Sequence, residues 1–231
     1  MNTPETEAPS WGAASIAALR AKLTDAFPCI YAATAQLTIA LAETATDVVD
    51  LERIKLGLLA WIGRTRDAAP KDAARMVFVV ILAPGSQPKP EADYTLETWG
   101  ILRYLRDHDP WPWPAAVPTN PAHPLWSFCF GGEPIFINAS SPAHVRRHSR
   151  DLGPGLVLVI QTRAGIDLLV PPGSAGDEIR RHIRARTHAF DDAPALPMFG
   201  PSGRVNDRDW KIICLPDDAG PIPVRCPLAP R

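Results

Sequence analysis

The sequence predicts a single α/β domain with a central mixed sheet and helices packed on it. Two continuous apolar runs rich in β-branched residues, Met76–Leu82 and Gly155–Ile160, indicate strands buried on both faces. Apolar residues recur at helical spacing over residues 15–27, 50–67 and 94–107. No linker or internal repeat divides the 231 residues, and 26 prolines indicate a loop-rich domain with rigid connections.

The remaining elements are predicted from shorter signals. Residues 1–12 are expected to form a disordered tail, and residues 13–231 the domain. Segment 29–42 is ambiguous between strand and helix. Strands are expected over 125–130 and 134–138, because they flank Gly131-Gly132, a hairpin signature.

After the hairpin, Ser141-Pro142 offers an N-cap and an N1 proline for a helix over 142–150. A basic helix is expected over 177–187 and a late strand over 211–215. The proline-rich tail from Pro216 to Arg231 is expected to wrap the surface or meet a partner, which makes a homodimer plausible.

Composition excludes several classes of protein. Lys and Arg number 24 against 25 Asp and Glu, so neither nucleic acid nor an anionic membrane is expected as a partner. The apolar runs are too short to span a bilayer. The first eleven residues lack an export signal, and the four cysteines contain no C-x-x-C pair, so we expect a cytoplasmic protein with reduced thiols.

The segment from Trp126 to Arg150 is the best candidate for chemistry. On the expected helix, His144 and His148 share one face at i,i+4, and Arg146 and Arg150 share another. Two imidazoles beside two guanidiniums suit a metal, an anion, or a cofactor such as heme that offers both. Basic helices of this kind are more often solvated faces, and a zinc site is less favoured because no H-E-x-x-H motif is present.

Several motifs spread over nearly the whole chain share the pattern of one known family. The most specific is the Phe-Cys-Phe-Gly-Gly-Glu-Pro hairpin, residues 128–134, with the arginines that follow it. The matching segments are Phe27-Pro28-Cys29, Trp111-Pro112, Phe128–Pro134, Pro142 with Arg146 and Arg150, Leu156–Ile160, and Asp209-Trp210-Lys211. On these residues the chain resembles the YqcI/YcgG family.

This resemblance implies a function. Family members placed in natural-product pathways are similar to heme-dependent N-hydroxylases, which oxidise an amine or guanidine nitrogen of a small amino-acid-like substrate. The implied cofactor is heme b and the oxidant O2 or peroxide. Because the sequence has no G-x-G-x-x-G or P-loop motif, any electron donor is expected to be a separate protein. By this resemblance His144 would ligate iron, and Arg146 and Arg150 would hold propionates or a substrate carboxylate. Glu133 is a further candidate, to orient a substrate amine, although an exposed residue of the hairpin is the simpler interpretation.

One departure from the family pattern concerns the iron ligand. Many members carry a His-Pro pair just after the second hairpin strand, where this chain has Ser141-Pro142. His144, three positions on, is the natural substitute and His148 the second choice, while a Cys29 thiolate is a competing ligand. Two alternative functions stay open: a heme-binding or heme-handling protein without turnover, and a non-heme interaction domain.

Overall fold

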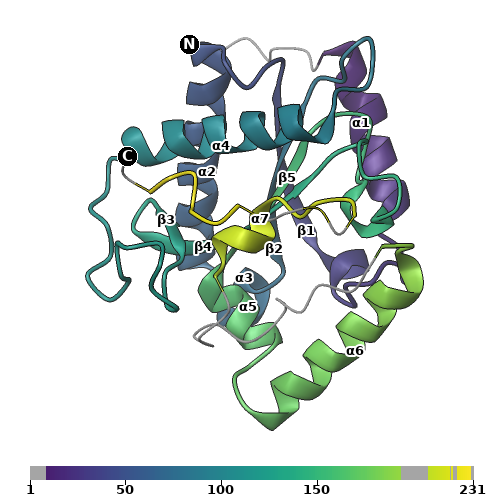
Figure 1. Cartoon of the computed structure of the whole chain (residues 1–231). Helices are drawn as coiled ribbons and strands as arrows, with labels where there is room; N and C mark the ends of the chain where they lie inside the picture. The colour runs from purple at the N-terminus through teal and green to yellow at the C-terminus, as the bar shows by residue number, and fades with distance from the viewer. Residues whose placement is uncertain (1–8, 194–207, 219, 221–222, 230–231) are drawn as a thin grey trace.

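A five-stranded mixed sheet with the order β1-β2-β5-β4-β3 runs through the molecule (Figure 1). The computed structural model describes residues 9–193, 208–218, 220 and 223–229. The strands are β1 (Gln36–Ala42), β2 (Met76–Leu82), β3 (Phe128–Phe130), β4 (Glu133–Ser140) and β5 (Val157–Thr162).

The strand directions place three loop regions at one edge of the sheet. β1 and β2 are parallel, β5 is antiparallel to both β2 and β4, and β3 is antiparallel to β4. Consequently β1, β2 and β4 run in the same direction and end at the same side. We call this side the carboxyl edge.

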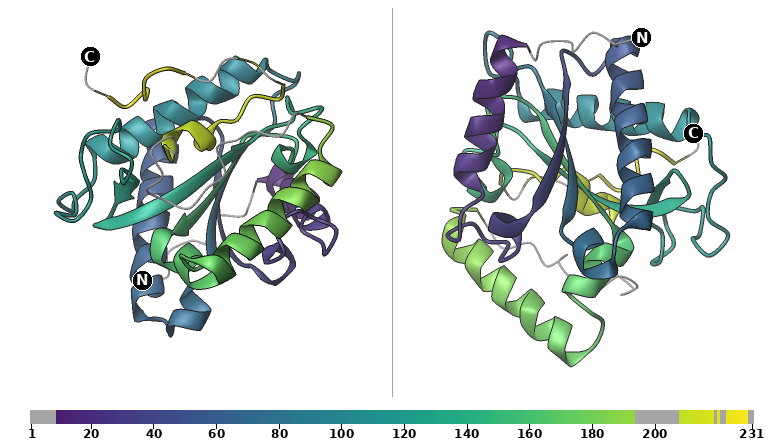
Figure 2. Two further views of the ribbon diagram at one scale, coloured as in Figure 1. Left: turned by 60° about the horizontal axis from the view of Figure 1, so that its bottom comes forward. Right: turned by 180° about the vertical axis from the view of Figure 1, so that it is seen from behind.

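Helices cover both faces of the sheet. Figure 2 shows α1 on one face and α2 with α4 on the other. The helices are α1 (Ser10–Lys22), α2 (Val48–Asp67), α3 (Pro70–Ala73), α4 (Glu91–Asp107), α5 (Arg163–Leu169), α6 (Ser174–Phe190) and α7 (Trp210–Ile213), with 3₁₀ turns at Ala32–Thr34 and His148–Arg150. None of these described helices has the length and apolar character needed to cross a bilayer.

β2 is buried on both faces, as its continuous apolar run predicts. Phe78 and Val80 belong to the larger core, which includes side chains of α2 and α4. Val79 and Ile81 point the other way, into a smaller core with Leu19 of α1. Each such side chain contributes about 1.5–3 kcal/mol when it is fully buried, so β2 is the centre of the domain.

The loop after β1 is fixed by two aspartates. Asp47 caps α2, because its Oδ1 accepts hydrogen bonds from the backbone N–H groups of Val49 (2.8 Å) and Asp50 (3.1 Å). Asp50 Oδ2 in turn accepts from the backbone N–H groups of Glu43 (2.9 Å) and Thr44 (3.0 Å). These bonds hold Glu43 and Thr44 at the carboxyl edge.

The predicted hairpin is confirmed. Gly131 and Gly132 have φ of +60° and +74° and connect the antiparallel strands β3 and β4. Positive φ at both central residues is what a type I′ turn requires, and glycine adopts it without steric cost.

The N-terminal helix begins earlier than its apolar pattern predicts. α1 spans Ser10–Lys22 instead of 15–27, so residues 10–12 belong to a helix and not to the tail. Trp11 packs against the smaller core beside Ile16, which explains the early start. Residues 1–8 of the expected tail lie outside the described part of the chain.

Two further expectations about secondary structure are wrong. Residues 211–215 do not form a strand; Trp210–Ile213 is the short helix α7, whose Trp210 and Ile213 both face the larger core. Short apolar runs do not distinguish a strand from a buried helix. The helix expected over 142–150 is also absent: the segment consists of turns and ends in the 3₁₀ turn.

The described part of the proline-rich tail packs on α4. Cys226 and Leu228 are buried in the larger core. Arg106 of α4 donates to the carbonyl oxygen of Leu228 (2.8 Å), and Arg103 donates to that of Pro227 (3.3 Å). The tail therefore extends the layer of α4.

Candidate functional site

Segment 142–150 follows β4 at the carboxyl edge, and carboxylates from later in the chain determine its shape. The backbone N–H groups of Arg146 and Arg147 donate to Asp217 (2.9 and 2.7 Å), and that of Ser149 donates to Asp191 (2.7 Å). In a helix these groups would donate to carbonyls four residues earlier. The carboxylates satisfy them instead, so the helix does not form.

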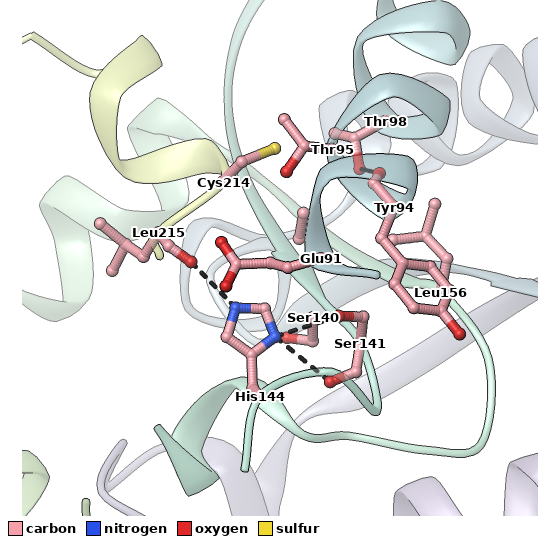
Figure 3. A pocket seen from close by; sticks show the side chains of 11 residues that line it. Glu91, Tyr94, Thr95, Thr98, Ser140, Ser141, His144, Leu156, Cys214 and Leu215 are labelled. Carbon is pink, nitrogen blue, oxygen red and sulfur yellow. Dashed lines mark hydrogen bonds between the residues drawn. The ribbon is translucent and has the colours of Figure 1, made fainter. Parts of the chain in front are cut away.

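The imidazole of His144 is buried and hydrogen-bonded at both nitrogens (Figure 3). Nε2 lies 2.9 Å from the carbonyl oxygen of Leu215, which can only accept, so Nε2 carries a proton. Nδ1 lies 3.1 Å from Ser141 Oγ and 3.2 Å from Ser141 O. In the neutral tautomer the Ser141 hydroxyl donates to Nδ1.

His144 lines a small cavity at the ends of β4 and α4, which we call the His144 cavity. Its volume is about 10 Å³, enough for about one water molecule. The buried hydroxyl of Ser140 lines it and has no hydrogen-bond partner among the described residues. The other residues that line it are Glu91, Tyr94, Thr95, Thr98, Ala139, Ser141, Leu156, Cys214 and Leu215.

Glu91 and Cys214 are the two carboxyl and thiol side chains that share this cavity with His144. Glu91 Oε2 accepts a hydrogen bond from the backbone N–H of Asp217 (3.0 Å). Burial raises the pKa of the Cys214 thiol to about 12, although contacts with Thr98, Arg150 and Thr95 lower it by smaller amounts. The thiol is therefore protonated at neutral pH and is no nucleophile there.

Arg150 is a structural side chain in this arrangement. Its Nη1 donates to the carbonyl oxygens of Ala139 (3.0 Å) and Ile213 (3.1 Å), and its Nη2 donates to Ile212 O (2.9 Å). Burial lowers the pKa of Arg150 to about 9, which still leaves the guanidinium charged at neutral pH. Arg150 thus joins β4 to α7.

Arg146 and His148 lie on a more exposed side of the same segment, near the end of α6. Arg146 Nη2 donates to Asp192 O (2.9 Å), and His148 Nε2 lies 3.2 Å from Asp192 Oδ2. The His148 ring stands edge-on to Phe190, with centroids 6.4 Å apart. The expected i,i+4 face of His144 and His148 does not exist, because one ring is buried beside Leu215 and the other faces α6.

Glu133 and Cys29 lie elsewhere. Glu133 begins β4, about 23 Å of extended chain from the end of that strand, and pairs with Arg66 Nε at 2.7 Å. Cys29 lies in the loop between α1 and β1, beside Arg186, and burial raises the pKa of its thiol. Neither residue lines the His144 cavity.

These residues do not form a heme site in this arrangement. Both nitrogens of His144 have protein partners, Arg150 donates to three backbone carbonyls, and Arg146 bonds Asp192 on the exposed side. The His144 cavity is also far smaller than the several hundred Å³ of ordinary ligand pockets. For a metal ion bound without a porphyrin, the described residues contain no group of three or more His, Cys, Asp or Glu arranged to hold it.

The fold and this edge define an α/β protein with an open mixed sheet whose candidate site lies where β4 ends. The chain belongs to the YqcI/YcgG family, whose model matches residues 17–229. It is 33% identical over 190 residues to DcsA of Streptomyces lavendulae, named as a candidate N(omega)-hydroxy-L-arginine synthase, covering 80% of this chain and 72% of that protein. It is 32% identical to YcgG of Bacillus subtilis, whose name states no function, covering 97% of this chain and 90% of YcgG. No solved structure matches it.

Several residues of this edge carry no signal in the sequence. Glu91 at the start of α4 and Cys214 after α7 line the His144 cavity only in the folded chain, where Asp217 also meets the backbone of Arg146 and Arg147. Asp217 follows Pro216 in a proline-rich stretch, where an aspartate indicates only a turn. Its hydrogen bonds to residues 70 and 71 positions away depend on the fold.

Proposed function

We propose that this protein N-hydroxylates an amine or guanidine nitrogen of a small amino-acid-like substrate, with arginine as the first candidate. The observation that carries the proposal is the 33% identity to DcsA over 80% of this chain. The name of that relative specifies hydroxylation at a guanidine nitrogen of L-arginine. Membership of the same family over residues 17–229 supports the transfer of the reaction class.

We also propose heme b as the cofactor. Insertion of oxygen into an N–H bond needs activated O2 or peroxide, which amino-acid side chains do not supply and heme does. The residues expected to bind heme do not form such a site as they are arranged here. Ligation by His144 would require its Nε2 to leave Leu215 or its Nδ1 to leave Ser141.

The first experiment is a visible absorption spectrum of the protein from cells supplied with a heme precursor. It is recorded before and after dithionite and CO, and after addition of hemin. A Soret band at about one heme per chain supports the cofactor, and its CO-shifted position distinguishes imidazole from thiolate ligation. A colourless protein that takes up no hemin overturns the heme proposal.

A second experiment tests the reaction. The protein is incubated with L-arginine and O2 plus a reductant, or with peroxide, and products are analysed by mass spectrometry. A product heavier by one oxygen atom, with the label retained from ¹⁸O2 or H2¹⁸O2, supports N-hydroxylation. Heme without any such product from a panel of amines and guanidines favours a heme-binding protein without turnover.

A further inference from the structure

A second and larger cavity lies at the carboxyl edge, where the parallel strands β1 and β2 end. Its volume is about 210 Å³. The loop after β1 contributes Glu43 and Thr44, the loop after β2 contributes Lys89, and α4 contributes Tyr94 and Glu97. Ligands of open α/β sheets bind outside the carboxyl ends of parallel strands, so this position suits a binding site. We call it the β1–β2 cleft.

The ionisable side chains of the cleft carry charges of both signs. Lys89 Nζ lies 2.5 Å from Glu97 Oε1 and 5.8 Å from the centre of the Tyr94 ring. Glu43 Oε1 accepts a hydrogen bond from Trp11 Nε1 (2.9 Å). Within the described part of the chain, the other oxygen of this carboxylate has no protein donor. Two carboxylates and one ammonium therefore face the same 210 Å³.

The charges of a basic amino acid are complementary to these two carboxylates and one ammonium. Such a ligand has an α-carboxylate, an α-ammonium and a cationic side chain. The Lys89–Glu97 pair matches the zwitterionic head group, with ammonium to carboxylate and carboxylate to ammonium. Glu43 is left for the side-chain cation. Charge-assisted hydrogen bonds of this kind are about twice as strong as neutral ones.

The cleft also adjoins the His144 cavity. Tyr94 and Leu156 line both of them and so form their common wall. Tyr94 is buried, and its hydroxyl lies 3.4 Å from the backbone N–H of Lys89. A ligand in the cleft is therefore one side chain away from the cavity that contains His144, Glu91 and Cys214.

We propose that the β1–β2 cleft binds a basic amino acid, with Lys89 and Glu97 on its head group and Glu43 on its side-chain cation. This rests on the proposed function only for the choice of L-arginine as the first probe. The charge pattern by itself selects the class of ligand.

Isothermal titration calorimetry on the full chain tests the proposal with three probes. L-arginine carries all three charges, agmatine lacks the carboxylate, and L-citrulline lacks the side-chain cation. We expect L-arginine to bind at one site per chain, with citrulline and agmatine each at least tenfold weaker. Glu43→Gln should weaken arginine at least tenfold and leave citrulline unchanged. Lys89→Met should weaken arginine but not agmatine.

Glu178→Gln is the matched control, because it removes the same charge from an exposed position on α6. It should bind all three probes like the wild type. Absence of arginine binding to the wild type, or equal effects of Glu43→Gln on arginine and citrulline, overturns the proposed site. Circular dichroism melts of each variant verify that it is folded.

The test of arginine binding in the cleft can fail or succeed independently of the test of N-hydroxylation. Arginine binding that depends on Glu43, without any oxygenated product, keeps the site and removes the N-hydroxylase. Product formation with an unchanged KM in Glu43→Gln keeps the N-hydroxylase and removes the site.

Discussion

The Nε2 atom of His144 lies 2.9 Å from the carbonyl oxygen of Leu215, a residue 71 positions later in the chain. This hydrogen bond connects the loop after β4 to the segment after α7. It gives His144 a structural role that competes with any role as an iron ligand, since a metal would need a nitrogen that now has a protein partner.

Substitutions of His144 distinguish the two roles. We expect His144→Ala to lower the free energy of unfolding by about 1–3 kcal/mol, because the buried Leu215 carbonyl loses its donor. His144→Gln supplies an amide donor of similar reach and should recover part of this loss. Urea denaturation measures the stability. If His144 is also the iron ligand, both variants lose the Soret band; a band retained in His144→Gln rules this out.

Arg150 and Arg146 should differ sharply in their importance for stability. Arg150→Met leaves the buried carbonyls of Ala139, Ile212 and Ile213 without a donor, so we expect a loss of about 3–5 kcal/mol. Arg146→Met removes an exposed bond to Asp192 and should cost less than about 1 kcal/mol. Chemical denaturation of both variants compares them. Equal losses would contradict the assignment of Arg150 as the buried connection between β4 and α7.

The hairpin turn requires glycine at position 131. Gly131→Ala places a Cβ at φ +60° and 3.1 Å from Ile62 Cδ1, so we expect a destabilisation of about 1–2 kcal/mol. Gly63→Ala is the control in α2, where an added Cβ meets nothing within 4 Å. It should stabilise the protein by about 0.5–1 kcal/mol, since alanine is the better helix former. Thermal melts of the two variants should therefore shift in opposite directions.

Buried thiols should make the protein less stable in alkaline solution. Burial raises the pKa of Cys214 and of Cys129 to about 12, from 9.0 in the unfolded chain. Between these values the unfolded chain loses the thiol proton while the native state keeps it. The stability that each thiol contributes is therefore complete below pH 9 and falls as the pH rises toward 12, by about 1 kcal/mol per thiol at pH 10, while the lowered pKa of Arg150 acts in the opposite direction above pH 9.

Urea denaturation at pH 8 and pH 10 measures this effect. In Cys214→Ala, the free energy of unfolding should differ between pH 8 and pH 10 by about 1 kcal/mol less than in the wild type. Any loss of packing affects both pH values equally and does not change this difference. A difference identical to that of the wild type would show that the Cys214 thiol ionises normally in the native state. Alkylation with iodoacetamide at pH 8 should likewise be slow at Cys214 until urea unfolds the chain.

Patterns of neighbouring residues were sufficient to predict several helices and strands. Met76–Leu82 forms a strand buried on both faces because every residue of the run is apolar. α2 and α4 follow their apolar spacing, and α2 extends from Val48 to Asp67, close to the expected 50–67. The Gly131-Gly132 hairpin forms because the turn demands residues that tolerate positive φ.

The candidate site could be located only roughly from the sequence. The last part of the predicted segment, from the end of β4 to Arg150, lies at the carboxyl edge, and His144 lines a cavity there. The sequence also named Glu133 as a candidate to orient a substrate and Cys29 as a ligand competing with His144; the structure puts Glu133 at the far end of β4 and Cys29 between α1 and β1. Spacing along a chain measures proximity only within one element, and none of these residues shares an element with His144.

The sequence by itself determined the α/β class, the central strands, the hairpin and the family pattern, because each depends on neighbouring residues. Only the tertiary structure decided the shape of segment 142–150 and the surroundings of its side chains. Backbone N–H groups of this segment donate to the carboxylates of Asp191 and Asp217 instead of to the carbonyls that a helix would provide. The β1–β2 cleft likewise joins three separate segments. A hydrogen bond or ion pair forms only when the fold places the two groups within about 3 Å of each other. The residues next to a donor in the sequence do not determine which distant residue becomes its partner.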